Sequence, residues 1–390
     1  MSLKLRAKSP KLVYGRLKYK MKFMCNIKMI GILFLAFAMQ ACHFRNSSDA
    51  KKTARMNTAD SLPVKDFLFG DDHPFPQCHA STLVRLDDGR FLAAWFGGTE
   101  EKDDDVGIWM VKGRPGHWDT PFEVAKIRNE PHWNPVLFKS PEGRIYLFFK
   151  VGKEIAQWET WLKTSDDEGN SWSEARELIP GDHGGRGPVR NKPIVLSNGT
   201  WLAGASNENG PWNVFFDRSE DEGKSWHATP YVEIDRQAIG GKGVIQPTIW
   251  ESAPGEVHAL LRSTGGVICR SDSRDYGNTW SPVYKTSLPN PNSAIDVTRL
   301  PDGTLALVFN PDDQNWGSRG TLAVALSFDN GNTWPRRIDL EAGSKDDEFS
   351  YPAIISFGDT MAVTYTWQRK KIAFWMGTKE WIMKNAKTYP

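Results

Sequence analysis

The chain has 390 residues, of which 39% are hydrophobic and 25% are charged, so it has the composition of a soluble globular protein and not of a disordered, collagen-like or multi-pass membrane protein. Four cysteines in a chain of this length exclude a disulfide scaffold, whereas 17 tryptophans and 34 glycines favour β-structure with many tight turns. The formal net charge is +2, but residues 1–41 carry nine Lys or Arg and no acid. The rest of the chain therefore carries about −7, which argues against a nucleic-acid partner.

The first 41 residues have the features of a secretory signal. A basic region ending at Lys28 precedes the apolar run Met29–Met39, which is too short to span a bilayer comfortably. Cys42 follows the small residue Ala41 and resembles the lipid-modified cysteine of a bacterial lipoprotein, and residues 42–61 form a polar tether. We therefore expect an exported protein held to a bacterial membrane, periplasmic or at the cell surface, only by a lipid on Cys42. A plain cleaved signal is the alternative.

One octapeptide occurs four times with the pattern Ser-x-Asp-x-Gly-x-Ser/Thr-Trp. The copies end at Trp172, Trp226, Trp280 and Trp334, which are 54 residues apart each time. Gly supplies a positive φ angle, and the Asp and Ser or Thr side chains can hydrogen-bond the turn backbone. We therefore interpret each octapeptide as a structural hairpin turn, with Trp packed between neighbouring sheets.

A second pattern repeats with the same period and consists of an apolar strand, a turn with Gly and another apolar strand. Its copies cover residues 79–95, 134–149, 192–203, 246–261, 293–309 and 351–364. Together with a third and fourth strand around each octapeptide, they predict six four-stranded units between residues 62 and 390. Such units, repeated radially, form an all-β, six-bladed β-propeller, in which we expect residues 64–70 to complete the sixth blade.

The repeat also predicts which side chains line a central pocket. The inner strand of each blade begins at the face where the second strand ends, and the octapeptides lie at the opposite face. Polar residues where inner strands begin are His79, Asn134, Lys192, Gln246, Ser293, Asp296 and Tyr351, and those where second strands end are Lys150, Glu208, Arg262, Asn310 and Arg369. Polar side chains converging on one axis are typical of a small-ligand pocket.

These residues resemble the sialidase superfamily in its Asp-box, or BNR-repeat, branch, and the four octapeptides correspond to intact Asp boxes. The resemblance rests on Arg262 at the end of a second strand, Arg319 before the octapeptide that ends at Trp334, and Tyr351 in the sequence Phe-Ser-Tyr-Pro. It implies that Arg262 and Arg319 bind a substrate carboxylate and that Tyr351 is the nucleophile. It also implies an acid/base Asp in the loop 97–107, for which Asp104 is our candidate.

Two positions depart from the superfamily. Gln77-Cys-His79-Ala occupies the place of the Phe-Arg-Ile-Pro motif that supplies a further arginine, and Gln246 replaces the Glu that activates the tyrosine. A neutral Gln cannot accept the phenol proton, so we expect Glu208 or His79 to lie close to the Tyr351 hydroxyl. Lys192, Gln246, Asn134, Lys150, Asp296 and Arg369 complete the predicted substrate-binding set.

Three functions remain open at this stage. The first is an exo-acting glycoside hydrolase that releases a terminal acidic sugar. The second is a lyase or glycosidase acting near uronic acids, with His79 and Tyr351 as the acid/base pair and Glu208 in a secondary role. The third is a non-catalytic glycan-binding propeller. We expect a monomer with a glycan or oligosaccharide ligand, no cofactor and no metal, because no His and Cys cluster has ligand spacing.

Overall fold

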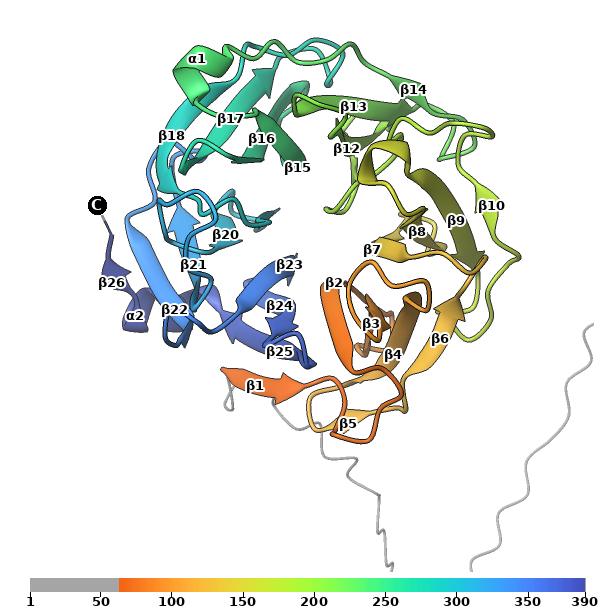
Figure 1. Cartoon of the computed structure of the whole chain (residues 1–390). Helices are drawn as coiled ribbons and strands as arrows, with labels where there is room; N and C mark the ends of the chain where they lie inside the picture. The colour runs from red at the N-terminus through yellow and green to blue at the C-terminus, as the bar shows by residue number, and fades with distance from the viewer. Residues whose placement is uncertain (1–62, 390) are drawn as a thin grey trace, which may run out of the picture. The chain divides into compact units, whose positions relative to one another are not determined.

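A computed structural model describes residues 63–389, so the predicted signal peptide 1–41, the tether and Cys42 lie outside the described residues. The described part consists of six antiparallel sheets placed around a central axis, and forms a six-bladed β-propeller (Figure 1). The predicted all-β fold is therefore confirmed.

Each sheet runs from an inner strand at the axis to an outer strand at the rim. Blade 1 contains β2 (Gln77–Arg85), β3 (Phe91–Gly98), β4 (Gly107–Arg114), β5 (His117–Trp118) and β6 (Phe122–Ala125). Blade 2 contains β7 (His132–Lys139), β8 (Ile145–Val151), β9 (Glu159–Ser165) and β10 (Arg176–Glu177). Blade 3 contains β11 (Ile194–Val195), β12 (Trp201–Asn207), β13 (Asn213–Ser219) and β14 (His227–Ala228).

The other three blades follow the same plan. Blade 4 contains β15 (Val244–Ala253), β16 (Glu256–Ser263), β17 (Val267–Ser273) and β18 (Tyr284–Pro289). Blade 5 contains β19 (Asp296–Arg299), β20 (Leu305–Phe309), β21 (Thr321–Ser327), β22 (Arg336–Ala342) and the added strand β26 (Lys387–Thr388). Blade 6 contains β23 (Phe349–Phe357), β24 (Thr360–Trp367) and β25 (Lys371–Thr378), and its outermost strand is β1 (Val64–Phe67).

Strand β1 closes the ring. It pairs antiparallel with β25, with Val64 opposite Met376 and Phe67 opposite Ala373, so the start of the described chain completes the last blade as expected. This closure joins residues from the two ends of the domain and removes an open sheet edge.

Three short helices supplement the strands. They are the 3-10 helix η2 (Ile155–Gln157), α1 (Arg236–Ile239) and α2 (Lys379–Asn385), which leads into β26. Across residues 63–389, no helix is long and apolar enough to cross a membrane.

The four octapeptides form nearly identical turns between the third and fourth strands of blades 2 to 5. In the first copy, the Asp167 carboxylate accepts hydrogen bonds from the backbone N–H and the hydroxyl of Ser171, at 2.8 and 2.6 Å, and from the Ser165 hydroxyl at 2.8 Å. Asp221, Asp275 and Asp329 repeat these contacts. The box carboxylates are thus occupied by their own turns, on the face opposite the start of the inner strands.

The hydrophobic core is divided among the blade interfaces. Six clusters of buried side chains lie between successive blades, including the pair formed by blades 1 and 6. Box tryptophans contribute as expected: Trp280 of blade 4 stacks on Phe216 of blade 3, with ring centroids 3.7 Å apart. Because apolar burial is spread around the ring, the axis is left for polar groups.

A β-bulge interrupts the inner strand of four blades near the face where those strands begin. The pairing register shifts there, and Ala80, Asn134, Gln246 and Tyr351 take φ angles of 58°, 39°, 55° and 51°. Three of these residues precede a proline, which has no N–H for the ladder. Positive φ is costly for residues other than glycine and is concentrated at functional sites. The bulges therefore mark this face of the axis as the place for a site.

Candidate functional site

Tyr351 lies at the centre of the candidate site, where three guanidinium groups surround its ring. The Cζ atoms of Arg190, Arg262 and Arg319 lie 5.5, 5.7 and 5.6 Å from the ring centroid. These arginines come from blade 3, from β16 and from the segment before β21, so the radial fold brings three distant segments to one phenol. Arg190 stabilises the β-bulge in β23, because its Nη2 donates to the carbonyls of Tyr351 and Pro352 at 2.5 and 2.9 Å.

Like Arg190, whose buried Nε and Nη1 have no hydrogen-bond partner, Arg262 has unused binding capacity. Its side chain is 4% exposed, and its Nη1 donates to the Tyr351 hydroxyl at 2.8 Å and to Gln246 Oε1 at 3.2 Å. Its Nε donates to Asn292 Oδ1 at 2.8 Å. Within residues 63–389, Arg262 has no carboxylate partner, and its Nη2 has no hydrogen-bond acceptor. A buried guanidinium held only by neutral groups is suited to an incoming anion.

Arg319 and Arg369 are joined by one carboxylate. Glu348 Oε1 lies 3.1 Å from Arg319 Nη1, and Glu348 Oε2 lies 2.9 Å from Arg369 Nε. Although burial opposes it, the hydrogen bond and charge of Arg369 hold the pKa of Glu348 below its usual value. The carbonyl of Asn292 accepts from Arg319 Nη2 at 3.2 Å, so Asn292 links Arg319 to Arg262. The two predicted arginines are therefore brought to the same side of Tyr351.

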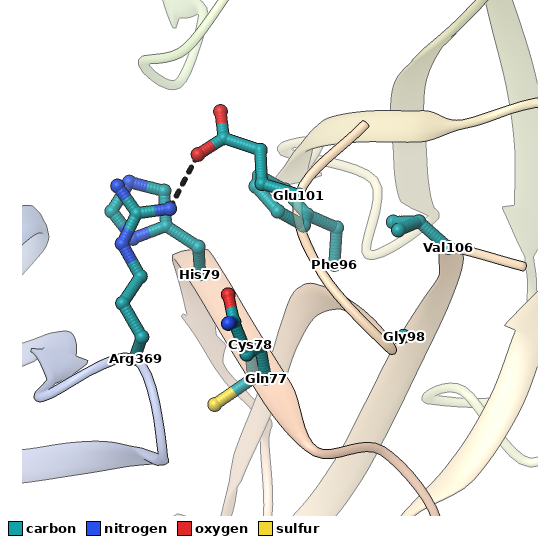
Figure 2. A pocket seen from close by; sticks show the side chains of 8 residues that line it. All are labelled: Gln77, Cys78, His79, Phe96, Gly98, Glu101, Val106 and Arg369. Carbon is teal, nitrogen blue, oxygen red and sulfur yellow. Dashed lines mark hydrogen bonds and ion pairs between the residues drawn. The ribbon is translucent and has the colours of Figure 1, made fainter. Parts of the chain in front are cut away.

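Arg369 comes from the tight turn between β24 and β25 and reaches the first blade. It forms an ion pair with Glu101 of the β3–β4 loop, and its carbonyl accepts the Cys78 N–H at 2.8 Å. Figure 2 shows the Glu101 carboxylate at the Arg369 guanidinium, beside His79. These residues line a narrow cleft that is too small to hold a water molecule. A cation from blade 6 thus stands beside the segment 77–80, where the superfamily arginine is absent.

His79 is 2% exposed, and neither ring nitrogen has a hydrogen-bond partner. Its ring centroid lies 4.0 Å from that of Tyr351. Burial lowers the pKa of His79 well below its usual value, and the nearby Arg369, Arg319, Arg190 and Arg262 lower it further. A neutral imidazole can accept a proton, but it adds no positive charge for a carboxylate.

The candidate acids lie in different surroundings. Asp104 lies at the surface: its side chain is 41% exposed, and Oδ2 lies 2.9 Å from Lys153 Nζ. Asp105 accepts the N–H and hydroxyl of Thr99 at 2.9 and 2.8 Å. In the described chain, Glu101 is the member of this loop that contacts an arginine of the site. The choice of Asp104 is therefore not supported by its position.

Glu208, at the end of β12, is half-buried and has no hydrogen-bond partner among the described residues. Burial raises the pKa of Glu208, and the charges of Arg262 and Lys242 only partly offset this effect. No hydrogen bond joins the Tyr351 hydroxyl to Glu208 or His79; its partner in the described chain is Arg262. We expect Glu208 or His79 to lie close to this hydroxyl: His79 is packed against the Tyr351 ring, but neither residue bonds the hydroxyl directly.

Four predicted binding residues are occupied by protein groups. Asn134 Nδ2 donates to the Val189 carbonyl at 3.1 Å. Lys192 Nζ lies 2.9 Å from Asp296 Oδ2, and Asp296 also accepts from Thr248 Oγ1 at 2.6 Å and from the Ile354 N–H at 2.9 Å. These contacts join blades 3, 4, 5 and 6 across the axis, which indicates a structural role for Lys192 and Asp296.

Lys150 likewise faces the neighbouring blade and not the axis. It is completely buried, and Nζ donates to Thr160 Oγ1 and to the Arg186 carbonyl, both at 2.7 Å. Burial lowers the pKa of Lys150 to about 7. Its ammonium group holds the 185–186 loop, so its contacts do not support the predicted role in substrate binding.

The sequence and fold of this chain are similar to those of known proteins. The BNR repeat-like domain family matches residues 89–363, which is more than half of the chain. The chain belongs to this family. Its fold is also similar to that of solved structures, each at low sequence identity. A Dyadobacter fermentans protein of unknown function is 18% identical, with a TM-score of 0.65, and the match covers 80% of this chain and 98% of that one.

Two solved relatives are named as enzymes. A Hadza microbial sialidase is 17% identical, with a TM-score of 0.67 and coverage of 82% of this chain and 69% of that chain. A leech intramolecular trans-sialidase, complexed with 2,7-anhydro-Neu5Ac, is 15% identical, with a TM-score of 0.64 and coverage of 83% and 71%. At these identities the likeness shows a sialidase-like propeller fold, and the activity of this chain has to be argued from its own site.

Arg190, Glu101, Asn292 and Glu348 are site residues that the sequence argument missed. Arg190 stands two positions before Lys192, which was taken as the start of the inner strand. Glu101 lies in the same β3–β4 loop as Asp104, where the resemblance implies an aspartate. Glu348 directly precedes β23, so the boundary of an inner strand was the signal available for it.

Proposed function

We propose that this protein is an exo-acting glycoside hydrolase that releases a terminal acidic sugar from glycans. The observation that carries the proposal is Arg262, a buried guanidinium bonded to the Tyr351 hydroxyl and lacking a carboxylate partner among the described residues. The sugar carboxylate would lie against Arg262 Nη2, and this contact places the anomeric carbon near the phenol oxygen. Arg319, linked to Arg262 through Asn292, reinforces the positive potential.

Tyr351 is the proposed nucleophile. A phenol oxygen attacking beside a carboxylated substrate suffers less charge repulsion than a carboxylate would. The Arg262 hydrogen bond and the three surrounding guanidinium groups stabilise negative charge that develops on this oxygen. Arg262 Nη1 donates to both Gln246 Oε1 and the Tyr351 hydroxyl, so Gln246 helps to orient the guanidinium. The neutral Gln246 amide cannot accept the phenol proton. Glu208 or His79, acting through one water, is the proposed proton acceptor.

The acid that protonates the leaving oxygen is proposed to be Glu101 or Glu208. Glu101 extends from the β3–β4 loop to Arg369 at the edge of the pocket. Glu208 has a pKa raised by burial, which keeps a carboxyl group protonated to higher pH. The pocket is narrow while Glu101 and Arg369 are paired, so substrate entry requires this pair to separate.

A second candidate function has one observation in its favour. His79 is a neutral imidazole whose two ring nitrogens have no hydrogen-bond partner. It is packed on Tyr351, and four arginines lie close enough to lower its pKa. A lyase acting near uronic acids needs such a base for the proton next to the carboxyl group, arginines to stabilise the resulting charge, and a tyrosine to protonate the leaving oxygen.

The test is a panel of sialyl, other ulosonyl and uronyl glycans, with products analysed by mass and by ultraviolet absorbance. Hydrolysis gives a free acidic sugar, whereas elimination gives an unsaturated uronate that absorbs in the ultraviolet. Tyr351→Phe should abolish turnover and leave glycan binding intact, and Tyr146→Phe, a substitution in blade 2, is the matched control. Binding of acidic glycans without any turnover would support the non-catalytic alternative. Absence of both would refute the proposal.

A further inference from the structure

A second set of reactive side chains lies in blade 4, near the turn between β15 and β16. Ser252 Oγ is 2.8 Å from His258 Nε2, and His258 Nδ1 is 2.5 Å from Asp272 Oδ1. Ser252 is on β15, His258 on β16 and Asp272 on β17, and His258 and Asp272 are opposite each other in the sheet. Since β15 ends at the face that carries the boxes, this set lies on the side of the propeller opposite the start of the inner strands.

Neighbouring residues determine the tautomer of His258. The Trp250 indole N–H can only donate, and it donates to Asn330 Oδ1 at 2.7 Å, so the Asn330 amide has one possible orientation. Asn330 Nδ2 then faces His258 Nε2 at 3.0 Å, which makes Nε2 an acceptor. Nδ1 and the Asp272 carboxylate lie 2.5 Å apart, which requires a proton between them, so the ring proton is on Nδ1 and is donated to Asp272. Arg270 Nη2 also lies 3.0 Å from Nδ1 but can only donate, so it makes no hydrogen bond to the protonated Nδ1, and Nε2 is the acceptor that the Ser252 hydroxyl and the Asn330 N–H share. This is the tautomer in which Nε2 can accept the hydroxyl proton of Ser252.

Asp272 is held as an ionised partner of the histidine. Its carboxylate accepts from Arg270 Nε at 2.9 Å and from the Tyr284 hydroxyl at 2.6 Å. Although burial opposes ionisation, hydrogen bonds from His258 and Tyr284 and the charge of Arg270 lower the pKa of Asp272 to about 2. An ionised, fixed carboxylate orients the imidazole and stabilises the imidazolium that forms when the serine is deprotonated.

A positive group lies beside the serine. Arg299, an exposed residue at the end of β19, donates from Nη2 to the Ser252 carbonyl at 3.4 Å. Ser252 itself is half-buried, so its hydroxyl can be approached from solvent. A guanidinium at this position can stabilise negative charge on a carbonyl oxygen that is attacked by Ser252. Nothing in the sugar site uses any of these residues.

We propose that Ser252, His258 and Asp272 form a second catalytic site, which hydrolyses small, unhindered carboxylic esters. Ser252 Oγ attacks the ester carbonyl carbon while His258 Nε2 takes its proton, and Arg299 stabilises the resulting oxyanion. The ester C–O bond breaks, and the alcohol leaves with the proton from His258. Water, deprotonated by His258, then attacks the acyl-serine, releases the carboxylic acid and restores the Ser252 hydroxyl.

The probes are a fluorophosphonate, which labels activated serines, and p-nitrophenyl acetate. The wild-type protein should carry one fluorophosphonate adduct, located at Ser252 by peptide mass spectrometry, and Ser252→Ala should remove it. His258→Gln should slow labelling and acetate release at least about a hundredfold, because a positioned general base contributes about that much. Arg299→Met should slow acetate turnover more than it slows labelling.

Two controls separate this site from its surroundings. Ser197 is a serine of the same face whose hydroxyl bonds to Glu251, with no histidine, so Ser197→Ala should label like wild type. Tyr351→Phe should also label normally, whatever happens to glycan turnover. No adduct above the heat-unfolded background, an adduct at another serine, or unchanged acetate release in Ser252→Ala would each overturn the proposal. Ser252 is half-buried at the edge of the cluster, so Ser252→Ala should fold normally. It therefore tests the proposal even if His258→Gln fails to fold.

Discussion

Arg262→Met is the substitution that tests the sugar site most directly, because it removes the charge and keeps the length of the side chain. Arg262 is the buried arginine that bonds the Tyr351 hydroxyl, at 2.8 Å, without an ion-pair partner in the described chain. Loss of one partner from a desolvated charge-assisted pair costs about 2–5 kcal/mol in binding. At about 1.4 kcal/mol per tenfold, the Kd for an acidic sugar should rise by about 30- to 4,000-fold.

The same substitution should change the free energy of unfolding only slightly. The variant loses hydrogen bonds from a charged donor to Tyr351, Gln246 and Asn292, each of which contributes about 1.5–3 kcal/mol. It also removes a guanidinium whose burial without a carboxylate costs several kcal/mol. The two effects have opposite signs and similar size, so the free energy of unfolding should stay close to that of wild type.

Isothermal titration with an acidic sugar, combined with thermal unfolding, measures both quantities. Arg337→Met is the matched control, because Arg337 pairs with Asp339 on β22, an outer strand of blade 5, whereas Tyr351 is on the inner strand of blade 6. A Kd within twofold of wild type would refute the carboxylate anchor. A large fall in the unfolding temperature with normal Kd would show that Arg262 is structural.

Two further substitutions address the proton transfers. Gln246→Glu places a carboxylate next to the Arg262 Nη1 that bonds the phenol. This carboxylate can accept the phenol proton, so kcat on a fluorogenic sialoside should rise. An unchanged or lower kcat would contradict the need for a base at this position. With Glu208 as the acid, Glu208→Gln should lower kcat at every pH and remove the fall of the residual activity at high pH, because burial raises the pKa of Glu208 and its acid form is lost as pH rises through that value. The same sign applies to stability: the buried carboxyl favours folding below the ordinary Glu pKa and loses this contribution as pH rises, so Glu208→Gln should raise the unfolding temperature at pH 8 and not at pH 4. Equal unfolding temperatures for the two proteins at pH 8 would contradict the raised pKa.

The fold was predictable because each blade is a local unit. The period of 54 residues places one Trp-ending turn between the third and fourth strands of each of four blades, and hydrogen bonds within each turn stabilise it without distant residues. Closure by β1 also followed from the repeat, since the sixth copy lacked its fourth strand. Repetition carries information about topology that a single strand pattern does not.

The site was only partly predictable because its geometry depends on departures from the repeat. In blade 3 the inner strand has two residues, and Arg190, ahead of it, reaches Tyr351, whereas Lys192 pairs with Asp296. Lys150 ends a second strand as predicted, but it bonds the 185–186 loop and not the axis. Strand phase thus predicts which end of a blade a residue occupies, and the bulges and loops decide what it contacts.

The β3–β4 loop shows how local contacts position the candidate acids that the resemblance implies. Three consecutive aspartates made Asp104 a natural choice, but Lys126 Nζ donates to the carbonyls of Asp104, Val106 and Glu130 at 2.6, 2.9 and 3.0 Å. These bonds fix the backbone of the loop, while Lys153 draws the Asp104 carboxylate outward. Glu101, nearer the start of the loop, is left to meet Arg369. The contacts of Lys126 and Lys153 with the loop, and not the number of acids in it, therefore leave Glu101 as the carboxylate that pairs with Arg369 beside His79.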